Sequence, residues 1–175
     1  MIDYTQPALG YLLRIPCSDV AADSPLDEPA RARAEMAAEF LSFERIGPIA
    51  AADHPAARET AECVRAACSP GSMEEAILYA TEDLQAVCSW LVDPLRGLPC
   101  VVVATGCGIE TMLGSLLQTF AEAPSPQGEK EVVGPGGLIS LHRDPETSAI
   151  VVRARTMVLN FAFADFVEAV NASGM

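Results

Sequence analysis

One short stretch constrains the fold more than any other. Residues 99–105, Pro-Cys-Val-Val-Val-Ala-Thr, are an unbroken apolar run rich in β-branched side chains. A run without polar alternation predicts a strand buried on both faces. Gly106-Cys107-Gly108 then turns the chain, and the apolar spacing from Ile109 to Phe120 predicts a helix. A strand of this kind has to be covered by other elements.

The N-terminal part supplies a strand and a helix. Residues 8–15 are a short apolar stretch that favours a strand. Asp27 is a good N-cap, and the proline that follows suits the first turn of a helix. Met36, Phe40 and Phe43 recur at helical spacing, which predicts that they form the buried stripe of this helix.

Two further helices are expected before the central strand. An alanine-rich helix begins at Pro55 and ends near Cys68. Ser72 and Glu75 then form a capping box, and apolar residues at helical spacing continue to Leu91. The region before residue 99 is therefore predicted to be mainly helical.

The C-terminal part predicts a β-hairpin and a last helix. Residues 138–143 and 149–159 form the two strands around an Asp-Pro-Glu-Thr turn, and Asn160 caps the helix. The predicted fold is α+β, a single domain over residues 1–175. N-terminal helices pack on a small, mostly antiparallel sheet that ends in this hairpin and helix. The loop 123–137, rich in proline and glycine, is the one candidate boundary between two lobes.

Charge excludes several classes of partner. The net charge is −13, from 24 acidic and 11 basic residues, which repels nucleic-acid phosphates and anionic membranes. The N-terminus has no signal-peptide pattern and no run approaches a membrane span, so the cytoplasm is the expected compartment. The acidity serves either solubility or contact with a basic or partly unfolded protein. The residues predicted to carry that contact are Glu74, Glu75, Glu82 and Asp83.

The six cysteines and two histidines predict no metal site and no cofactor. The chain has no C-x-x-C pair, and its cysteine content is far below that of a disulfide scaffold. Most of these thiols are expected to be small buried apolar residues.

The turn at Cys107 is the most pointed candidate for chemistry. A thiol between glycines on a strand-to-helix turn resembles a nucleophile elbow, and a helix N-terminus stabilises a thiolate. His142 is the candidate base. Against this hypothesis, glycine explains a tight turn sterically, and Glu110 beside the thiol would raise its pKa. The G-x-G pattern lacks the third glycine of a nucleotide fingerprint, because Thr111 stands in its place.

The C-terminal half resembles a known family. Residues 137–147, 150–155 and 163–170 resemble the hairpin and Phe-Val helix that close type III secretion chaperones of the Tir chaperone class. The helix 110–120 resembles the dimerisation helix of that family. The resemblance implies an acidic cytosolic chaperone, whereas the long helical N-terminal region departs from the family pattern.

These observations favour a non-enzymatic, cytosolic binding protein, either chaperone-like or a neutralising partner of another protein. The apolar excess suggests that a partner or a second copy covers part of the surface, as in a homodimer. The residues predicted to form that interface are Leu113, Leu116, Leu117 and Phe120. The alternative is a small cysteine-dependent enzyme that uses Cys107.

Overall fold

The computed structural model of the chain describes residues 8–68, 78–81, 84–91, 93, 98–120, 134–144, 146 and 150–155. Its helices and strands follow one another in this order: β1 (Gly10–Arg14), the 3-10 helix η1 (Asp19–Ala21), α1 (Glu28–Ser42), β2 (Ile49–Ala52), α2 (Pro55–Cys68), β3 (Leu78–Thr81), α3 (Leu84–Leu91), β4 (Cys100–Ala104), α4 (Gly106–Phe120), β5 (Leu138–Arg143) and β6 (Ile150–Arg155).

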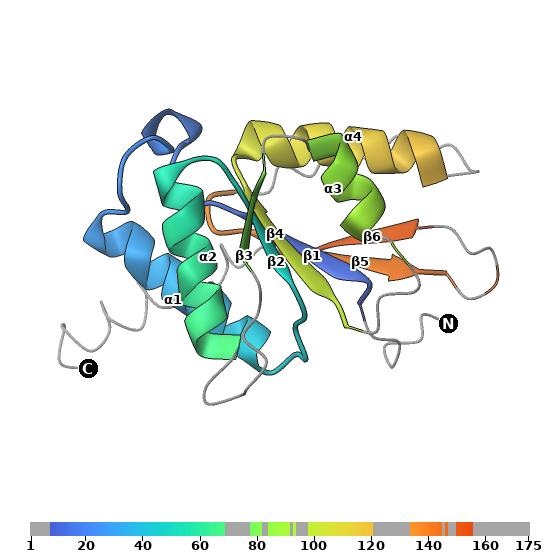
Figure 1. Ribbon diagram of the computed structural model, residues 1–175, viewed down its shortest axis with the longest axis horizontal. Helices are drawn as coiled ribbons and strands as arrows, with labels where there is room; N and C mark the ends of the chain where they lie inside the picture. The colour runs from blue at the N-terminus through green and yellow to red at the C-terminus, as the bar shows by residue number, and fades with distance from the viewer. Residues whose placement is uncertain are drawn as a thin grey trace, which may run out of the picture.

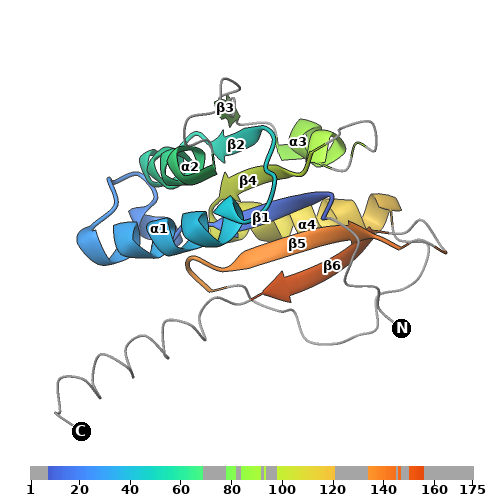
Figure 2. The same ribbon diagram turned by 90° about the horizontal axis from the view of Figure 1, so that it is seen from below.

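The strands form one six-stranded sheet in the order β3-β2-β4-β1-β5-β6, seen from below in Figure 2. β3, β2, β4 and β1 run parallel to one another. β5 is antiparallel to both β1 and β6. All five residues of β4 are buried, as expected for a strand with neighbours on both sides and helices on both faces.

Helices cover both faces of the sheet, so the fold has three layers. Figure 1 shows α1 and α2 on one side of the strands and α3 and α4 on the other. Neighbouring residues of β1 point to opposite layers. Leu13 joins a cluster with the alanines of α1 and α2. Leu12 joins a second cluster with Met112 and Leu116 of α4.

The predicted α+β class is confirmed, but the sheet is mixed rather than mostly antiparallel, because three of its five pairings are parallel. The difference arises from two strands that the sequence did not predict. β2 is Ile-Ala-Ala-Ala, and alanine favours helix over strand. β3 lies inside the segment predicted to be one helix from residue 72 to 91, since its apolar run fits either period.

The buried face of α1 also differs from the prediction. The helix begins as expected, because the Asp27 carboxylate accepts a hydrogen bond of 2.8 Å from the Ala30 amide. Its buried residues are Ala30, Ala34, Ala37, Ala38 and Leu41. Of the predicted stripe, Phe40 is partly buried against this cluster, whereas Phe43 is 83% exposed, so the prediction is wrong at Phe43. Alanines on both helices let the α1 and α2 backbones approach closely, and the Phe43 ring stays outside.

Several predictions concern residues outside the described ranges. They include the capping box, the four acidic residues Glu74, Glu75, Glu82 and Asp83, most of the loop 123–137, and the C-terminal helix from Asn160. The strands on both sides of that loop belong to the same sheet. None of the described helices combines the length and apolarity needed to cross a membrane.

The two core clusters predict where truncation is costly. Leu12→Ala and Leu13→Ala should each lower the free energy of unfolding by about 2–5 kcal/mol, because each leaves a cavity on one face of the sheet. Urea denaturation measures the change. Val20→Ala is the control, since Val20 is 96% exposed and its truncation should cost less than about 0.5 kcal/mol. A cost below about 1 kcal/mol at either leucine would contradict a core on both faces.

Candidate functional site

The parallel strands bring three connections to one edge of the sheet. Leu13, Val103 and Ala51 lie in register across β1, β4 and β2. The carboxyl ends of these strands therefore meet at the same edge, which in open sheets with parallel strands is where ligands bind. Arg14 ends β1, and helices α2 and α4 begin just beyond β2 and β4.

An internal carboxylate lies at the start of α4. The two oxygens of Asp19 accept hydrogen bonds from the backbone amides of Gly106, at 2.7 Å, and Cys107, at 2.9 Å. One of these oxygens is 3.6 Å from the Arg14 guanidinium. Asp19 opens η1 in the β1–α1 loop (residues 15–27), the dark-blue arch beside the start of α4 in Figure 1. We call the group formed by Arg14 and these two amides the anion site.

Gly106 is required for the close approach of Arg14. A Cβ atom at residue 106 would lie 2.7 Å from Cζ and 2.8 Å from Nε of Arg14. The guanidinium therefore packs directly against the first turn of α4, and its charge adds to the positive end of the helix dipole. The glycine that sequence analysis attributed to a tight turn also makes room for this side chain.

The surroundings of Asp19 stabilise its charged form. Partial burial alone would raise the pKa of Asp19, but the Cys107 and Gly106 amides and the charge of Arg14 outweigh burial and hold this pKa below its usual range. Hydrogen bonds to a carboxylate favour its ionised state. The anion site therefore binds a negative charge, and in this structure the charge belongs to the protein itself.

A histidine and an arginine lie where β2 leads into α2, and each is also matched by an aspartate. Nη2 of Arg58 donates to the Asp53 carboxylate. Nδ1 of His54 is 2.8 Å from an oxygen of Asp23, in the β1–α1 loop. The charge of His54 also contributes to lowering the pKa of Asp19, so the two parts of the edge are close enough to interact.

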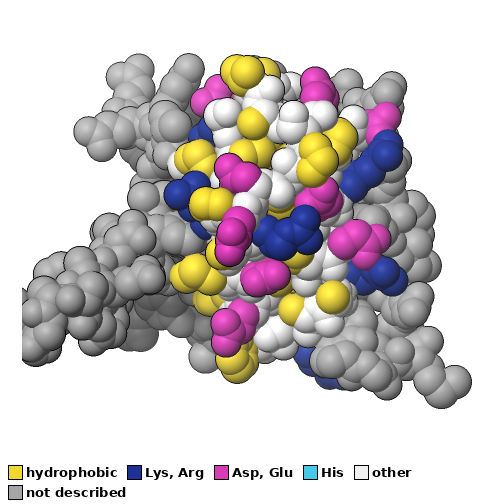
Figure 3. Space-filling model, turned by 90° about the vertical axis from the view of Figure 1, so that its left-hand side faces the viewer, with side chains coloured by type: hydrophobic (Ala, Val, Ile, Leu, Met, Phe, Trp, Pro, Cys, Tyr) yellow, Lys and Arg dark blue, Asp and Glu magenta, His cyan; other side chains and the backbone are white. Residues whose placement is uncertain are grey.

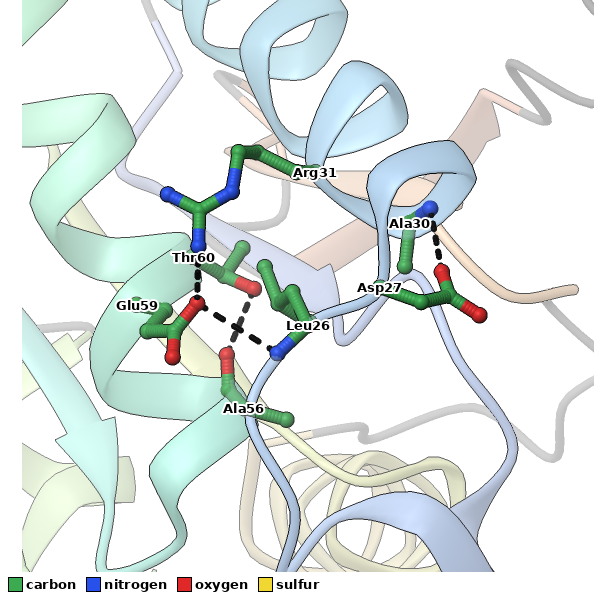
Figure 4. Close-up of polar contacts among 7 residues, drawn as sticks. All are labelled: Leu26, Asp27, Ala30, Arg31, Ala56, Glu59 and Thr60. Carbon is green, nitrogen blue, oxygen red and sulfur yellow. Dashed lines mark hydrogen bonds and ion pairs between the residues drawn. The ribbon is translucent and has the colours of Figure 1, made fainter.

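The β1–α1 loop is fixed to α2 at its far end. The Ala22 carbonyl accepts a hydrogen bond from the Ala56 amide at 3.1 Å. One oxygen of Glu59 accepts both from the Leu26 amide at 3.3 Å and from Arg31 of α1 at 2.9 Å, as Figure 4 shows. The loop thus supplies hydrogen-bond acceptors to amides at the first turns of both α4 and α2.

The structure does not bring the predicted catalytic pair together. Cys107 is exposed, as an elbow would require. His142, however, follows Leu141, which pairs with Gly10 at the amino end of β1. Arg14 and the turn at Cys107 lie beyond the opposite end of that strand, about 13 Å away at roughly 3.3 Å per residue. His142 Nε2 is instead 3.0 Å from the Ser140 hydroxyl.

The other cysteines fit the predicted structural role. Cys88 and Cys100 are buried, and Cys17, Cys63 and Cys68 pack partly buried against a core cluster. Burial raises the pKa of Cys68 to about 11, which disfavours its reactive thiolate. Among the described residues, no group of three His, Cys, Asp or Glu side chains could hold a metal ion.

The predicted interface leucines lie partly in the core. Leu116 is fully buried, and Leu113 packs against the same cluster, so these two side chains hold α4 on the sheet. The side chains of Leu117 and Phe120 are not among those described. On the face that α1 and α2 present, Figure 3 shows acidic side chains interspersed with arginines. Ion pairs such as Arg31–Glu59 and Arg65–Glu62 account for part of this pattern.

No protein-family model and no curated protein sequence matches the chain. Several solved structures share its fold. Mycobacterial glucosyl-3-phosphoglycerate phosphatase, solved with VO3, is 16% identical with a TM-score of 0.59, over 83% of this chain and 96% of that one. The Agrobacterium tumefaciens protein assigned as phosphohistidine phosphatase SixA is 16% identical with a TM-score of 0.53, over 84% and 99%. Phosphoglycerate mutase from Plasmodium falciparum is 16% identical with a TM-score of 0.54, over 82% and 86%.

These neighbours correct the family resemblance and the function inferred from sequence. They are phosphatases and a mutase, not type III secretion chaperones, so the chaperone resemblance is wrong. The predicted non-enzymatic, chaperone-like binding role is contradicted with it. The predicted alternative, an enzyme, agrees better with these neighbours, but nothing in them supports its dependence on Cys107. At this identity the likeness itself establishes the fold.

The lowered pKa of Asp19 predicts a change in stability with pH. A carboxylate whose pKa is lower in the folded state stabilises the fold above its ordinary pKa, and this contribution disappears as the pH falls toward the folded value. The free energy of unfolding of Asp19→Asn should therefore change less than that of the wild type between about pH 4 and pH 2. Urea denaturation across that range measures the two slopes.

Asp27→Asn is the matched control, because it removes another carboxylate from the same loop. The Asp27 carboxylate accepts from an amide in the first turn of α1 instead of α4. Equal slopes for Asp19→Asn and the wild type would contradict the assigned contacts with Gly106 and Cys107.

Proposed function

We propose that the protein is an enzyme of phosphoryl chemistry, which binds the phosphoryl group of a small phosphorylated substrate at the anion site and hydrolyses it. The observation that carries the proposal is the Asp19 carboxylate, held by two α4 amides and Arg14. Groups that bind a carboxylate in this way also suit a phosphoryl oxygen. The fold shared with enzymes named as phosphatases supports the same chemistry, one of them solved with inorganic phosphate.

Arg58 is the second cation that we assign to the substrate. It lies in α2, which begins at the same edge of the sheet, and its side chain is about half exposed. A phosphoryl group carries its charge on several oxygens, so two guanidinium groups and the α4 amides can share it. Release from Asp53 would free Arg58 for this contact.

We assign the proton transfer to His54. Asp23 accepts from Nδ1 in the tautomer that carries the proton there, which leaves the Nε2 lone pair available as a base. In the proposed step a water oxygen attacks phosphorus while Nε2 takes the proton of that water. The bond between phosphorus and the leaving oxygen breaks, and solvent supplies the proton to the leaving group. His142, at the other end of β1, takes no part.

We retain the cytoplasm as the proposed compartment, since six cysteines without a disulfide among the described residues suit a reducing environment. The predicted protein partner and homodimer stay predictions.

Phosphate release from a panel of phosphomonoesters and phosphohistidine tests the activity. His54→Asn should lower kcat by about 10²–10⁴-fold, because it removes a general base, and should leave the affinity for orthovanadate unchanged. Cys107→Ser is the control and should retain full activity, since the backbone amide, not the thiol, forms the site. Full activity in His54→Asn would overturn the role of His54. If the wild type and Asp19→Asn both release no phosphate from any substrate, hydrolysis itself is refuted.

Gly106→Ala tests the position of Arg14 without removing its charge. The added methyl group should displace the guanidinium from α4, because Cζ would lie 2.7 Å away. We expect weaker binding of orthovanadate, and a free energy of unfolding within about 1 kcal/mol of the wild type. Gly114→Ala in the same helix is the control, since a Cβ there meets nothing within 4 Å. Equal vanadate affinity in both variants would contradict the assigned role of Arg14.

A further inference from the structure

The β1–α1 loop occupies the groups that we assign to the substrate. Asp19 takes the two α4 amides and pairs with Arg14. Asp23, from the same loop, contacts Nδ1 of His54 and orients it as the proposed base, so of these two aspartates it is Asp19 that takes donors assigned to the substrate. A phosphoryl group and the Asp19 carboxylate are both anions that need the same donors, so they cannot be bound together.

The local charge reinforces this competition. Two arginines, Arg14 and Arg58, lie at the edge together with three aspartates, Asp19, Asp23 and Asp53. With His54 neutral, these five groups leave the edge with a net negative charge, which disfavours an incoming anion. Removal of Asp19 from the edge leaves two positive and two negative groups, and it uncovers Arg14.

The segment that carries Asp19 contributes little to the core. No residue of η1 is buried, and Val20 is 96% exposed. Ala22 and Leu26, which follow η1, are buried and hydrogen-bonded to α2. A short segment with few apolar contacts opens at low cost, whereas its anchored end stays in place. The structure thus separates a releasable piece, Asp19–Ala21, from a fixed one.

We propose that η1 is an autoinhibitory latch, in which the Asp19 carboxylate stands where a phosphoryl group binds and the ligand enters only after η1 has moved away. This inference rests on the proposed function, because it concerns access to the same anion site. The observed affinity for a phosphoryl ligand then equals the intrinsic affinity reduced by the fraction of molecules with η1 released. A substitution at Asp19 that weakens its contacts but leaves Arg14 and the two amides in place raises that fraction and strengthens binding.

Isothermal titration with inorganic phosphate and with orthovanadate tests the latch in the full chain. Asp19→Asn keeps the size of the side chain and removes its charge, so it should bind both anions about tenfold more tightly or better. Asp27→Asn is the matched control, with the same substitution in the same loop, and should bind like the wild type. Arg14→Met should lose binding in either background. Where Asp19→Asn does not fold, Asp19→Ser replaces it, since serine also removes the charge and its hydroxyl oxygen can still accept a hydrogen bond.

The outcomes separate the latch from the proposed function. Tighter binding in Asp19→Asn alone, abolished by Arg14→Met, supports both. Equal affinity of the wild type and Asp19→Asn, with binding abolished by Arg14→Met, overturns the latch and leaves the anion site. Absence of phosphate and vanadate binding in every variant, Asp19→Asn included, overturns the proposed function. Hydrogen exchange gives an independent measure: the Gly106 and Cys107 amides should exchange faster in Asp19→Asn and become protected again by vanadate. Exchange that stays as slow as in the wild type contradicts the latch.

Discussion

The burial of β4 between two parallel neighbours is the constraint on which the candidate site depends. Because Cys100–Ala104 pairs in parallel with both β1 and β2, the connections that leave these three strands emerge at one edge. Since both faces of β4 are apolar, helices must cover both, and the chain enters α2 and α4 directly after β2 and β4. Two helix N-termini, whose first amides have no partner within their own helix, therefore lie beside the end of β1. The topology alone thus places the positive ends of two helix dipoles at this edge of the sheet, without any contribution from side chains.

Carboxylates of the protein itself pair with the hydrogen-bond donors at that edge. The side chains of Arg14, His54 and Arg58 each have an aspartate partner, and two of the three partners come from the loop that follows β1. In a protein of net charge −13, carboxylates are abundant, and the one that the loop carries to the α4 amides is that of Asp19. Hydrogen bonds at exposed or half-exposed positions contribute modestly to stability. Under the proposed latch, the same contacts have a larger effect on which anion binds at this edge of the sheet, the Asp19 carboxylate or a phosphoryl ligand.

The sequence predicted much of the fold where one pattern dominates. The buried run of β4, the proline-led α2 from Pro55 to Cys68 and the strands β5 and β6 all appear at the expected places. The failures share a cause. β2 is three alanines after an isoleucine, and α1 buries alanines where larger side chains were expected. Alanine favours helix over strand, and at β2 the tertiary contacts, which a local pattern does not contain, override that preference. Without β2 and β3, the parallel character of the sheet could not be inferred.

One part of the candidate site, the turn at Gly106 and Cys107, could be identified from the sequence. The other part, Asp19, could not, because only the tertiary structure brings it to this turn. The turn at Gly106 and Cys107 was identified as the point where chemistry could occur, because a glycine pair between a strand and a helix is a local signal. The signal pointed to the thiol, whereas the contacts that the structure shows with Asp19 at this turn are made by the backbone amides. Asp19, which they bind, is 87 residues from Gly106 along the chain, and it sits in a stretch of small polar residues that resembles any loop. Only the parallel register of β1 and β4 makes the two meet. A site assembled from backbone amides therefore becomes recognisable only once the sheet order is known. Here the Asp19 carboxylate that accepts from the Gly106 and Cys107 amides identifies the site better than the Cys107 side chain does.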